Sequence, residues 1–293
     1  FRRVLFRSIV DDYAGFLVVQ FHTLGMESIR EMVLDVLEKQ LAPRGIYERS
    51  DVGTRRAEGL DDRPTGLLRG AEPPEFVEVE EAGVRLFIDV YRGQKTGFFI
   101  DQRTNRTQVQ QLATKADVLN LFAYSSAFSA HALRGGARSV LDVDISQRAP
   151  FAARRNVEAN RPPDAAHQYL VADAFPFIED LAKGGPRYDI VVVDPPSLVR
   201  KRDREQVKRA MGVYTKLNRN AMRVIRDGGL LVTASCSTPI AQEDFFEVVR
   251  RACTSARVQA RILSYNLHAA DHPVDPTFPD GRYLKCIIAQ IWR

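Results

Sequence analysis

Residues 118–122 read Val-Leu-Asn-Leu-Phe, and the small-residue stretch Ala-Tyr-Ser-Ser-Ala-Phe-Ser follows them at 123–129. Further apolar runs follow, separated by segments of helical character, at 139–143, 168–171, 188–193 and 229–234. Short apolar runs that alternate with helices predict a parallel sheet covered on both faces, which is a doubly wound α/β fold. Ligands of such sheets bind at the carboxyl ends of the strands, so the residues that follow each run are the first candidates for function.

The chain before residue 110 has a different pattern. Residues 16–20 predict a strand. Within 26–41 the helical spacing of apolar residues predicts an amphipathic helix, whose apolar face is Ile29, Met32, Val33, Val36 and Leu37. Residues 51–74 are rich in charge, glycine and proline, which indicates a loop. Alternating runs at 76–80 and 84–90, with Gly83 between them, predict a β-hairpin.

The first eight residues, Phe-Arg-Arg-Val-Leu-Phe-Arg-Ser, resemble a translated sequencing-adapter scar, with an ordinary basic strand as the alternative. We exclude the octet from functional reasoning. If the scar interpretation holds, the natural gene begins further upstream.

Composition limits the function classes. A length of 293 residues predicts about two domains. No apolar run approaches the roughly 20 residues of a membrane helix. Three scattered cysteines give no support to a disulfide framework or a zinc site, so we expect no metal and a reduced, cytoplasmic compartment. The net charge of +5 permits a nucleic-acid partner without requiring one.

Acidic residues follow three of the predicted strands. Asp144 is placed to accept hydrogen bonds from a ribose diol, with a helix-capping acid as the alternative. Asp173 could contact an adenine amino group, although a plain loop acid is the simpler interpretation. Asp194 opens Asp-Pro-Pro-Ser, in which two prolines fix the backbone and hold the carboxylate at a strand end, with a structural turn as the alternative. Ser146 is the predicted N-cap of a helix over 146–160.

Cys236 follows the fifth run, next to the predicted position of Asp194. A lone cysteine is usually a small buried hydrophobe, but a strand-end position favours a nucleophilic thiolate here. We favour the structural interpretation for Cys253 and Cys286.

Eight motifs occur in an order that resembles the S-adenosylmethionine-dependent RNA methyltransferases of the ribosomal RNA large-subunit methyltransferase I type, which make 5-methylcytosine. The most specific is Gly-Gln-Lys-Thr-Gly-Phe-Phe-Ile-Asp-Gln-Arg-Thr-Asn-Arg at 93–106. The others lie at 120–124, 143–146, 194–197, 213–218, 235–237, 270–273 and 283–285.

The resemblance implies a class I methyltransferase domain with a seven-stranded sheet, whose antiparallel seventh strand runs from about residue 283 to 291. It implies a small α/β RNA domain at 9–75, a β-hairpin and linker at 76–110, and the methyltransferase domain at 111–293. Family members usually carry an N-terminal PUA domain, whose absence agrees with a truncated start. S-adenosylmethionine is the implied cofactor. Its implied contacts are Asp144, Asp173, Asp194, Gln102, Arg103, Tyr124, Ser125 and Ala127.

The turn at 124–127 departs from the family pattern because it contains no glycine. Serine and alanine cost more than glycine wherever φ must be positive, so cofactor binding could be weaker than in relatives, with a turn that does not need positive φ as the alternative.

The resemblance also implies a mechanism in which the Cys236 thiolate adds to C6 of cytosine and activates C5. Asp194 would hydrogen-bond the N3/N4 edge. The expected partner is ribosomal RNA with a single-stranded or flipped-out cytosine, and a homodimer is compatible with the sequence. Phosphate contacts are expected from Arg200, Lys201, Arg202 and Lys208, with a solvated helix face as the alternative.

Four alternatives remain. Methylation of an adenine amino group is disfavoured because Ser197 stands where an aromatic residue would stack the base. A related guanine-N7 enzyme lacks a cysteine at the position of Cys236. A non-catalytic RNA-binding relative is supported only by the glycine-free turn. Methyl transfer to a small molecule is the weakest alternative, because it leaves the hairpin domain unexplained.

Overall fold

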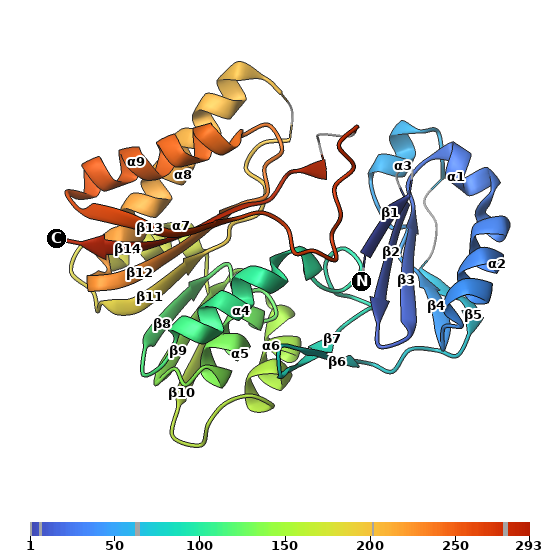
Figure 1. Ribbon diagram of the computed structural model, residues 1–293, viewed down its shortest axis with the longest axis horizontal. Helices are drawn as coiled ribbons and strands as arrows, with labels where there is room; N and C mark the ends of the chain where they lie inside the picture. Colours follow the sequence, from blue (N-terminus) through green and yellow to red (C-terminus); the bar gives the residue numbers. More distant parts are fainter. Residues whose placement is uncertain (1, 6–7, 62–64, 201, 278–280) are drawn as a thin grey trace. The chain divides into compact units, whose positions relative to one another are not determined.

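The computed structural model describes residues 2–5, 8–61, 65–200, 202–277 and 281–293 (Figure 1). The chain forms two compact units. The first comprises Phe1–Asp101 with Ala270–Pro273, and the second comprises Gln102–Ala269 with Val274–Arg293.

The first unit is built on a five-stranded sheet of order β1-β2-β3-β4-β5. The core between this sheet and its helices is formed by residues such as Leu17, Phe21, Leu34 and Ile46. The strands are β1 Arg2–Leu5, β2 Ser8–Tyr13, β3 Phe16–Phe21, β4 Gly45–Glu48 and β5 Gly66–Gly70. The helices are α1 Leu24–Ser28, α2 Arg30–Leu41 and α3 Thr54–Ala57.

The structure confirms the strand at 16–20 and corrects two other predictions. The predicted helix over 26–41 is two helices that meet at Ile29. Its predicted apolar face is also partly wrong, because Met32 is 64% exposed whereas Leu34 is fully buried. The predicted loop at 51–74 contains α3 and β5, and β5 pairs with β4.

The predicted hairpin is confirmed as β6 Val77–Glu81 and β7 Val84–Ile88. Ala82 and Gly83 connect the strands with φ values of 51° and 77°. Positive φ at both central residues matches a type I′ turn, whose twist suits antiparallel strands.

The second unit contains a seven-stranded sheet of order β10-β9-β8-β11-β12-β14-β13. The first five strands in this order are parallel, and β14 is antiparallel to both neighbours, which confirms the predicted sheet and its antiparallel last strand. The strands are β8 Asp117–Leu121, β9 Ser139–Asp144, β10 Ala166–Val171, β11 Tyr188–Val193, β12 Ile225–Ser235, β13 Gln259–Asn266 and β14 Lys285–Trp292.

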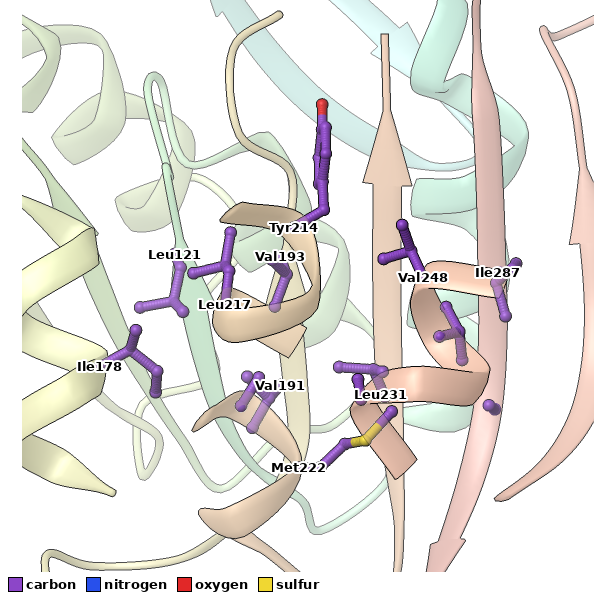
Figure 2. Close-up of a cluster of buried hydrophobic side chains, with 14 of the residues drawn as sticks. Leu121, Ile178, Val191, Val193, Tyr214, Leu217, Met222, Leu231, Val248 and Ile287 are labelled. Carbon is purple, nitrogen blue, oxygen red and sulfur yellow. The ribbon is translucent and has the colours of Figure 1, made fainter. Parts of the chain in front are cut away.

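Helices pack on both faces of this sheet (Figure 1). They are α4 Arg103–Leu112, which follows the 3₁₀ turn Ile100–Gln102, then α5 Ala127–Arg134, α6 Ala149–Glu158, α7 Ala174–Leu181, α8 Arg204–Arg223 and α9 Gln242–Ala256. Side chains of α7, α8 and α9 pack with Val191 and Val193 of β11 (Figure 2), whereas those of α4, α5 and α6 pack with Ile190 and Val192. Strands buried on both faces explain the continuous apolar runs in the sequence.

Two local predictions have different outcomes. Helix α6 begins at Ala149 with Arg148 as its N-cap residue, so the predicted cap at Ser146 is wrong, although Ser146 Oγ accepts a hydrogen bond from the Ala149 N–H. Cys286 is fully buried in β14, and burial raises the pKa of its thiol. Cys253 packs against the core from α9. Both cysteines are therefore core residues, as predicted.

Candidate functional site

The turn between β8 and α5 is held in a strained shape. Phe122, Tyr124 and Ser126 have φ values of 60°, 46° and 59°. Residues with a Cβ rarely adopt these angles unless surrounding contacts compensate for the strain. Ser125 is 4% exposed, and its Oγ has no hydrogen-bond partner among the described residues. A buried hydroxyl of this kind fits a polar group of a bound ligand.

Asp144 lies at the carboxyl end of β9 and faces this turn. Its Oδ2 accepts the Tyr124 N–H at 2.9 Å, and its Oδ1 accepts the Ser146 N–H at 2.8 Å. Two backbone donors therefore fix the plane of the carboxylate, while each oxygen keeps a second lone pair for a ribose hydroxyl. The geometry fits the nucleoside part of the predicted cofactor.

Asp173 and the pair Gln102–Arg103 occupy helix starts. Asp173 caps α7, because its Oδ1 accepts the Phe175 N–H at 2.9 Å. Gln102 is buried immediately before α4, and its Oε1 accepts a hydrogen bond from Asn105 Nδ2. Arg103 is the first residue of α4. A contact of these three side chains with the cofactor stays a prediction.

The structure brings the Asp194 and Cys236 turns together. Strands β11 and β12 are parallel neighbours with Val193 opposite Thr233, so their carboxyl ends lie side by side. Cys236 is partly buried, and its Sγ lies 3.9 Å from the Pro195 carbonyl oxygen. The prediction that two strand ends place these turns beside each other is confirmed.

Ser237 links the two turns. Its Oγ accepts the Leu198 N–H at 3.1 Å and lies 3.2 Å from both Ser197 Oγ and the Tyr214 hydroxyl. Figure 2 shows the Tyr214 ring extending from α8 with its hydroxyl directed away from the apolar cluster. Burial raises the pKa of Tyr214 to about 12, so this hydroxyl is neutral at physiological pH. The segments around Asp194 and Cys236 are thus fixed relative to each other.

Lys285 carries a positive charge to the same place, and sequence reasoning did not assign it a role. It is 1% exposed at the start of β14, opposite Ser235, and its Nζ donates to the carbonyl oxygens of Ser237 and Tyr283 at 2.8 Å each. Burial lowers the pKa of Lys285 to about 8, while its interaction with Cys236 acts in the opposite direction. The feature of the sequence that could have indicated this role is a lysine at the start of the apolar run 285–292.

A basic pocket of about 460 Å³ lies next to these turns. Arg202 and Lys208, two of the predicted phosphate contacts, line it together with Arg204, Thr238 and Pro239. Arg200 is exposed but is not part of the lining, and Lys201 lies outside the described residues. The alternative of a solvated helix face fits Arg209, which is exposed and pairs with Glu205.

Neither a metal centre nor a membrane span is found in the described part of the chain. No three His, Cys, Asp or Glu side chains there are grouped so that they could hold a metal ion. None of the helices within the described ranges combines the length and apolarity needed to cross a bilayer.

Comparisons with known proteins define the class of this protein. The seven-stranded sheet, with the carboxylate of Asp144 fixed at the end of β9, agrees with that class. A sequence model of the S-adenosylmethionine-dependent methyltransferases matches residues 60–277. A solved structure from Streptococcus mutans, described as a SAM-dependent methyltransferase, superposes with a TM-score of 0.82 at 25% identity, covering 97% of this chain and 71% of that one. A methyltransferase complexed with S-adenosylhomocysteine gives the same values. The chain is an S-adenosylmethionine-dependent methyltransferase of class I fold.

Curated relatives narrow the family. The ribosomal RNA large subunit methyltransferase I of Aeromonas salmonicida is 38% identical over 281 residues, which is 96% of this chain and 70% of the relative. The protein of the same name from Aliivibrio fischeri is 37% identical over 94% of this chain and 69% of its own length. The chain therefore belongs to the ribosomal RNA large subunit methyltransferase I family, with S-adenosylmethionine as its cofactor.

Proposed function

We propose that the protein transfers the methyl group of S-adenosylmethionine to C5 of a cytosine in large-subunit ribosomal RNA through a covalent adduct with Cys236. The observation that carries the proposal is the pairing of a cysteine turn with an aspartate turn at adjacent strand ends, joined through Ser237. The names of the relatives support the RNA substrate.

The role of Cys236 in this proposal is to make C5 of the cytosine nucleophilic. Cytosine C5 is a poor nucleophile, whereas the bound cofactor offers an electrophilic methyl group. Addition of the Cys236 thiolate to C6 forms an S–C6 bond and moves the electrons of the C5–C6 double bond toward C5. C5 would then take the methyl group as its bond to the sulfonium sulfur breaks, with S-adenosylhomocysteine as the leaving group, and a base would remove the C5 proton. The electrons of that C–H bond restore the double bond as the thiolate leaves.

Asp194 supplies recognition and charge stabilisation in this proposal. Its carboxylate would accept a hydrogen bond from the cytosine N4 amino group and, with a proton shared at N3, stabilise charge that develops on the ring. The prolines that follow it fix the backbone, and Ser197 Oγ donates to the Val199 carbonyl oxygen at 2.9 Å. A rigid carboxylate avoids reorganisation during the reaction.

Lys285 supports the thiolate form of Cys236. The interaction between the two groups is reciprocal, since a thiolate that favours the ammonium is favoured by it to the same extent. The buried position of Lys285 strengthens this interaction, because solvent screening is weak there. We therefore assign to Lys285 a supporting role for the nucleophile.

The basic pocket supports RNA as the substrate. Arg202, Arg204 and Lys208 surround a cavity beside Thr238 and Pro239, two and three residues after Cys236. Cationic side chains in this position suit the phosphates that flank a target nucleotide. A cytosine in duplex RNA must leave the stack to reach a cysteine at a strand end, so the substrate form is single-stranded or flipped-out.

Transfer of tritiated methyl groups tests the proposal. Ribosomal RNA from cells that lack this activity is incubated with the protein and labelled cofactor, digested to nucleosides and separated. The proposal expects label in 5-methylcytidine. Label in 7-methylguanosine or N6-methyladenosine would overturn the base assignment, and absence of label from RNA would overturn the substrate.

A further inference from the structure

The glycine-free turn between β8 and α5 depends on a buried carboxylate beneath it. Ser126 stands directly before α5 with φ 59° and ψ 29°, which is the left-handed conformation. Glycine adopts this conformation freely, whereas a side chain makes it unfavourable. Some interaction must therefore hold Ser126 there.

Asp142 supplies that interaction. It is 0% exposed in the middle of β9, and its Oδ2 accepts a hydrogen bond from Ser126 Oγ at 2.5 Å. Ser129 Oγ, one turn further along α5, donates to Oδ1 of the same carboxylate. The Asp142 carboxylate thus accepts hydrogen bonds both from the residue before α5 and from the first turn of α5.

The carboxylate is anchored on both sides by neighbouring strands. Asn120 of β8, directly opposite in register, donates from Nδ2 to Oδ1 at 2.9 Å. His167 of β10 lies with its Nε2 2.7 Å from Oδ2. Asp142 therefore has partners on both neighbouring strands, β8 and β10, and at the start of α5, which compensates for its complete burial.

The position of Ser126 determines the position of the cofactor-facing backbone. The Ser126 N–H donates to the Ala123 carbonyl oxygen at 2.8 Å, and Tyr124 between them donates to Asp144. Asn156 Nδ2 donates to the Ser125 carbonyl oxygen at 2.8 Å. A shift of Ser126 would move the N–H that orients the proposed ribose-binding carboxylate and the buried hydroxyl of Ser125.

We propose that Asp142 is a positioning residue for cofactor binding, which holds Ser126 in the backbone conformation that glycine would adopt unaided. This inference rests on the proposed role of the turn at 124–127 and of Asp144 in binding S-adenosylmethionine. Sequence composition left open whether a turn without glycine weakens that binding. The Asp142 carboxylate answers the question, because it replaces the conformational freedom of glycine with a hydrogen bond.

Isothermal calorimetry with S-adenosylmethionine and no RNA tests the inference on the full chain. Ser126→Ala keeps the Cβ and removes the bond to Asp142, so it should raise Kd about tenfold, the scale of one buried hydrogen bond. Ser126→Gly removes the same bond but also the strain, and should bind several-fold more tightly than Ser126→Ala. Asp142→Asn should raise Kd at least as much as Ser126→Ala, and adding Ser126→Gly to it should recover part of the affinity.

Ser129 provides the matched control. It shares the Asp142 carboxylate but sits inside α5, where glycine relieves no strain. Ser129→Gly should therefore bind no better than Ser129→Ala. The inference is overturned if glycine and alanine at 126 weaken binding equally, or if Ser126→Gly gives no recovery in the Asp142→Asn background.

Two further outcomes are separable. If Asp142→Asn does not fold, the comparison of alanine with glycine at 126 decides alone, because both changes remove the same bond and leave the other partners of the carboxylate in place. If the unmodified protein fails to bind the cofactor, the assignment of the cofactor site is wrong. If it binds but the glycine effect is absent, only the role of Asp142 is wrong.

Discussion

Asp144 illustrates how a single residue acquires its proposed role from its surroundings. Two backbone N–H groups, from Tyr124 and Ser146, fix its carboxylate at the strand end. The sequence placed an acid there, but only the fold supplies the two donors. The capping alternative is wrong, because the Ser146 N–H that Asp144 accepts lies before Arg148, the N-cap residue of α6.

We expect Asp144→Ala to weaken S-adenosylmethionine binding by ~1–3 kcal/mol, the scale of buried hydrogen bonds to a charged group. Calorimetry measures the change. Asp180→Ala is the matched control, since Asp180 is an acid 73% exposed whose partner is Lys183 on the surface. Equal affinity for the Asp144 variant and the control would exclude the ribose role.

Lys285 affects the pH at which the Cys236 thiolate forms in this proposal. Burial lowers the pKa of Lys285 to about 8, so at pH 7 it keeps its proton and its ammonium favours the thiolate. Lys285→Met should therefore lower kcat/KM at pH 7 and move the rise of kcat/KM with pH to higher pH. Lys216→Met, which alters a surface pair with Glu179, should keep the profile.

The burial of Lys285 also makes the free energy of unfolding depend on pH. The pKa of Lys285 is lower in the folded chain than in the unfolded one, so the unfolded state binds more protons between them. The free energy of unfolding contributed by this group therefore rises from pH 8 to about 10.4. A rise of kcat/KM with pH that is unmoved in Lys285→Met would contradict the supporting role of Lys285.

At the scale of elements, the amino ends of the central strands are tied by charge. Asp117 of β8 accepts hydrogen bonds from Arg138 Nε at 2.9 Å and Ser139 Oγ at 2.7 Å, and pairs with Arg226 at 2.9 Å. These partners stand just before or within β9 and β12. The network lies at the edge opposite the functional turns, so we assign it to stability.

Asp117→Asn should lower the free energy of unfolding at pH 7 by about 1–2 kcal/mol, because Arg138 is largely solvent-exposed and its contribution is screened. The arginines hold the pKa of Asp117 well below its usual range. Its contribution is therefore present above about pH 4 and disappears as the pH falls further. Denaturant titrations at pH 7 and pH 3 check the sign, with Asp180→Asn as the surface control.

Elements were predictable from sequence where both faces are buried. Apolar runs such as 188–193 identified the parallel strands, because such strands need apolar residues on each face. Strand β5 escaped prediction because Leu67 is 37% exposed and its segment begins and ends with glycine, so pairing with β4 defines it. The division of the predicted helix at Ile29 was not predicted either. Tertiary packing also decides which face of the second helix is buried, and it buries Leu34 and Leu37.

The candidate site was only partly predictable. The strand-end rule located Asp144, Asp194 and Cys236, since it depends only on where apolar runs stop. It could not find Lys285. One carbonyl that Lys285 binds belongs to Tyr283, two residues earlier, but the other belongs to Ser237, which is distant in the chain. Nor could it find Asp142, which lies in mid-strand and acquires its partners from β8, β10 and α5.

At the scale of the whole molecule, net charge is a weak guide to the partner. The octet at 1–8 supplies three arginines and no acid, so the remaining chain carries only +2 of the formal +5 (5 − 3). The proposal of an RNA substrate is supported instead by Arg202, Arg204 and Lys208, which line one pocket. Local density of charge, rather than the total, determines phosphate binding.

Replacing Arg202, Arg204 and Lys208 with glutamine should reduce the slope of log K against log salt for single-stranded RNA by about 2, at ~0.7 for each phosphate that is no longer neutralised. A control that removes the same charge from Arg154, Lys183 and Arg250, which are 68–80% exposed, should leave the slope unchanged. Equal effects of the two triple variants would show that the pocket is only a solvated face.

Covalent trapping is a decisive experiment for the proposed adduct with Cys236. RNA that contains 5-fluorocytidine would form this adduct and accept the methyl group, but fluorine does not leave C5 as a proton does, so the adduct would persist. We predict a protein–RNA complex that survives denaturing electrophoresis, requires S-adenosylmethionine, forms with Cys253→Ala and is absent with Cys236→Ala. Methyl transfer by Cys236→Ala at the rate of the unmodified protein, with no trapped complex in either, would contradict it.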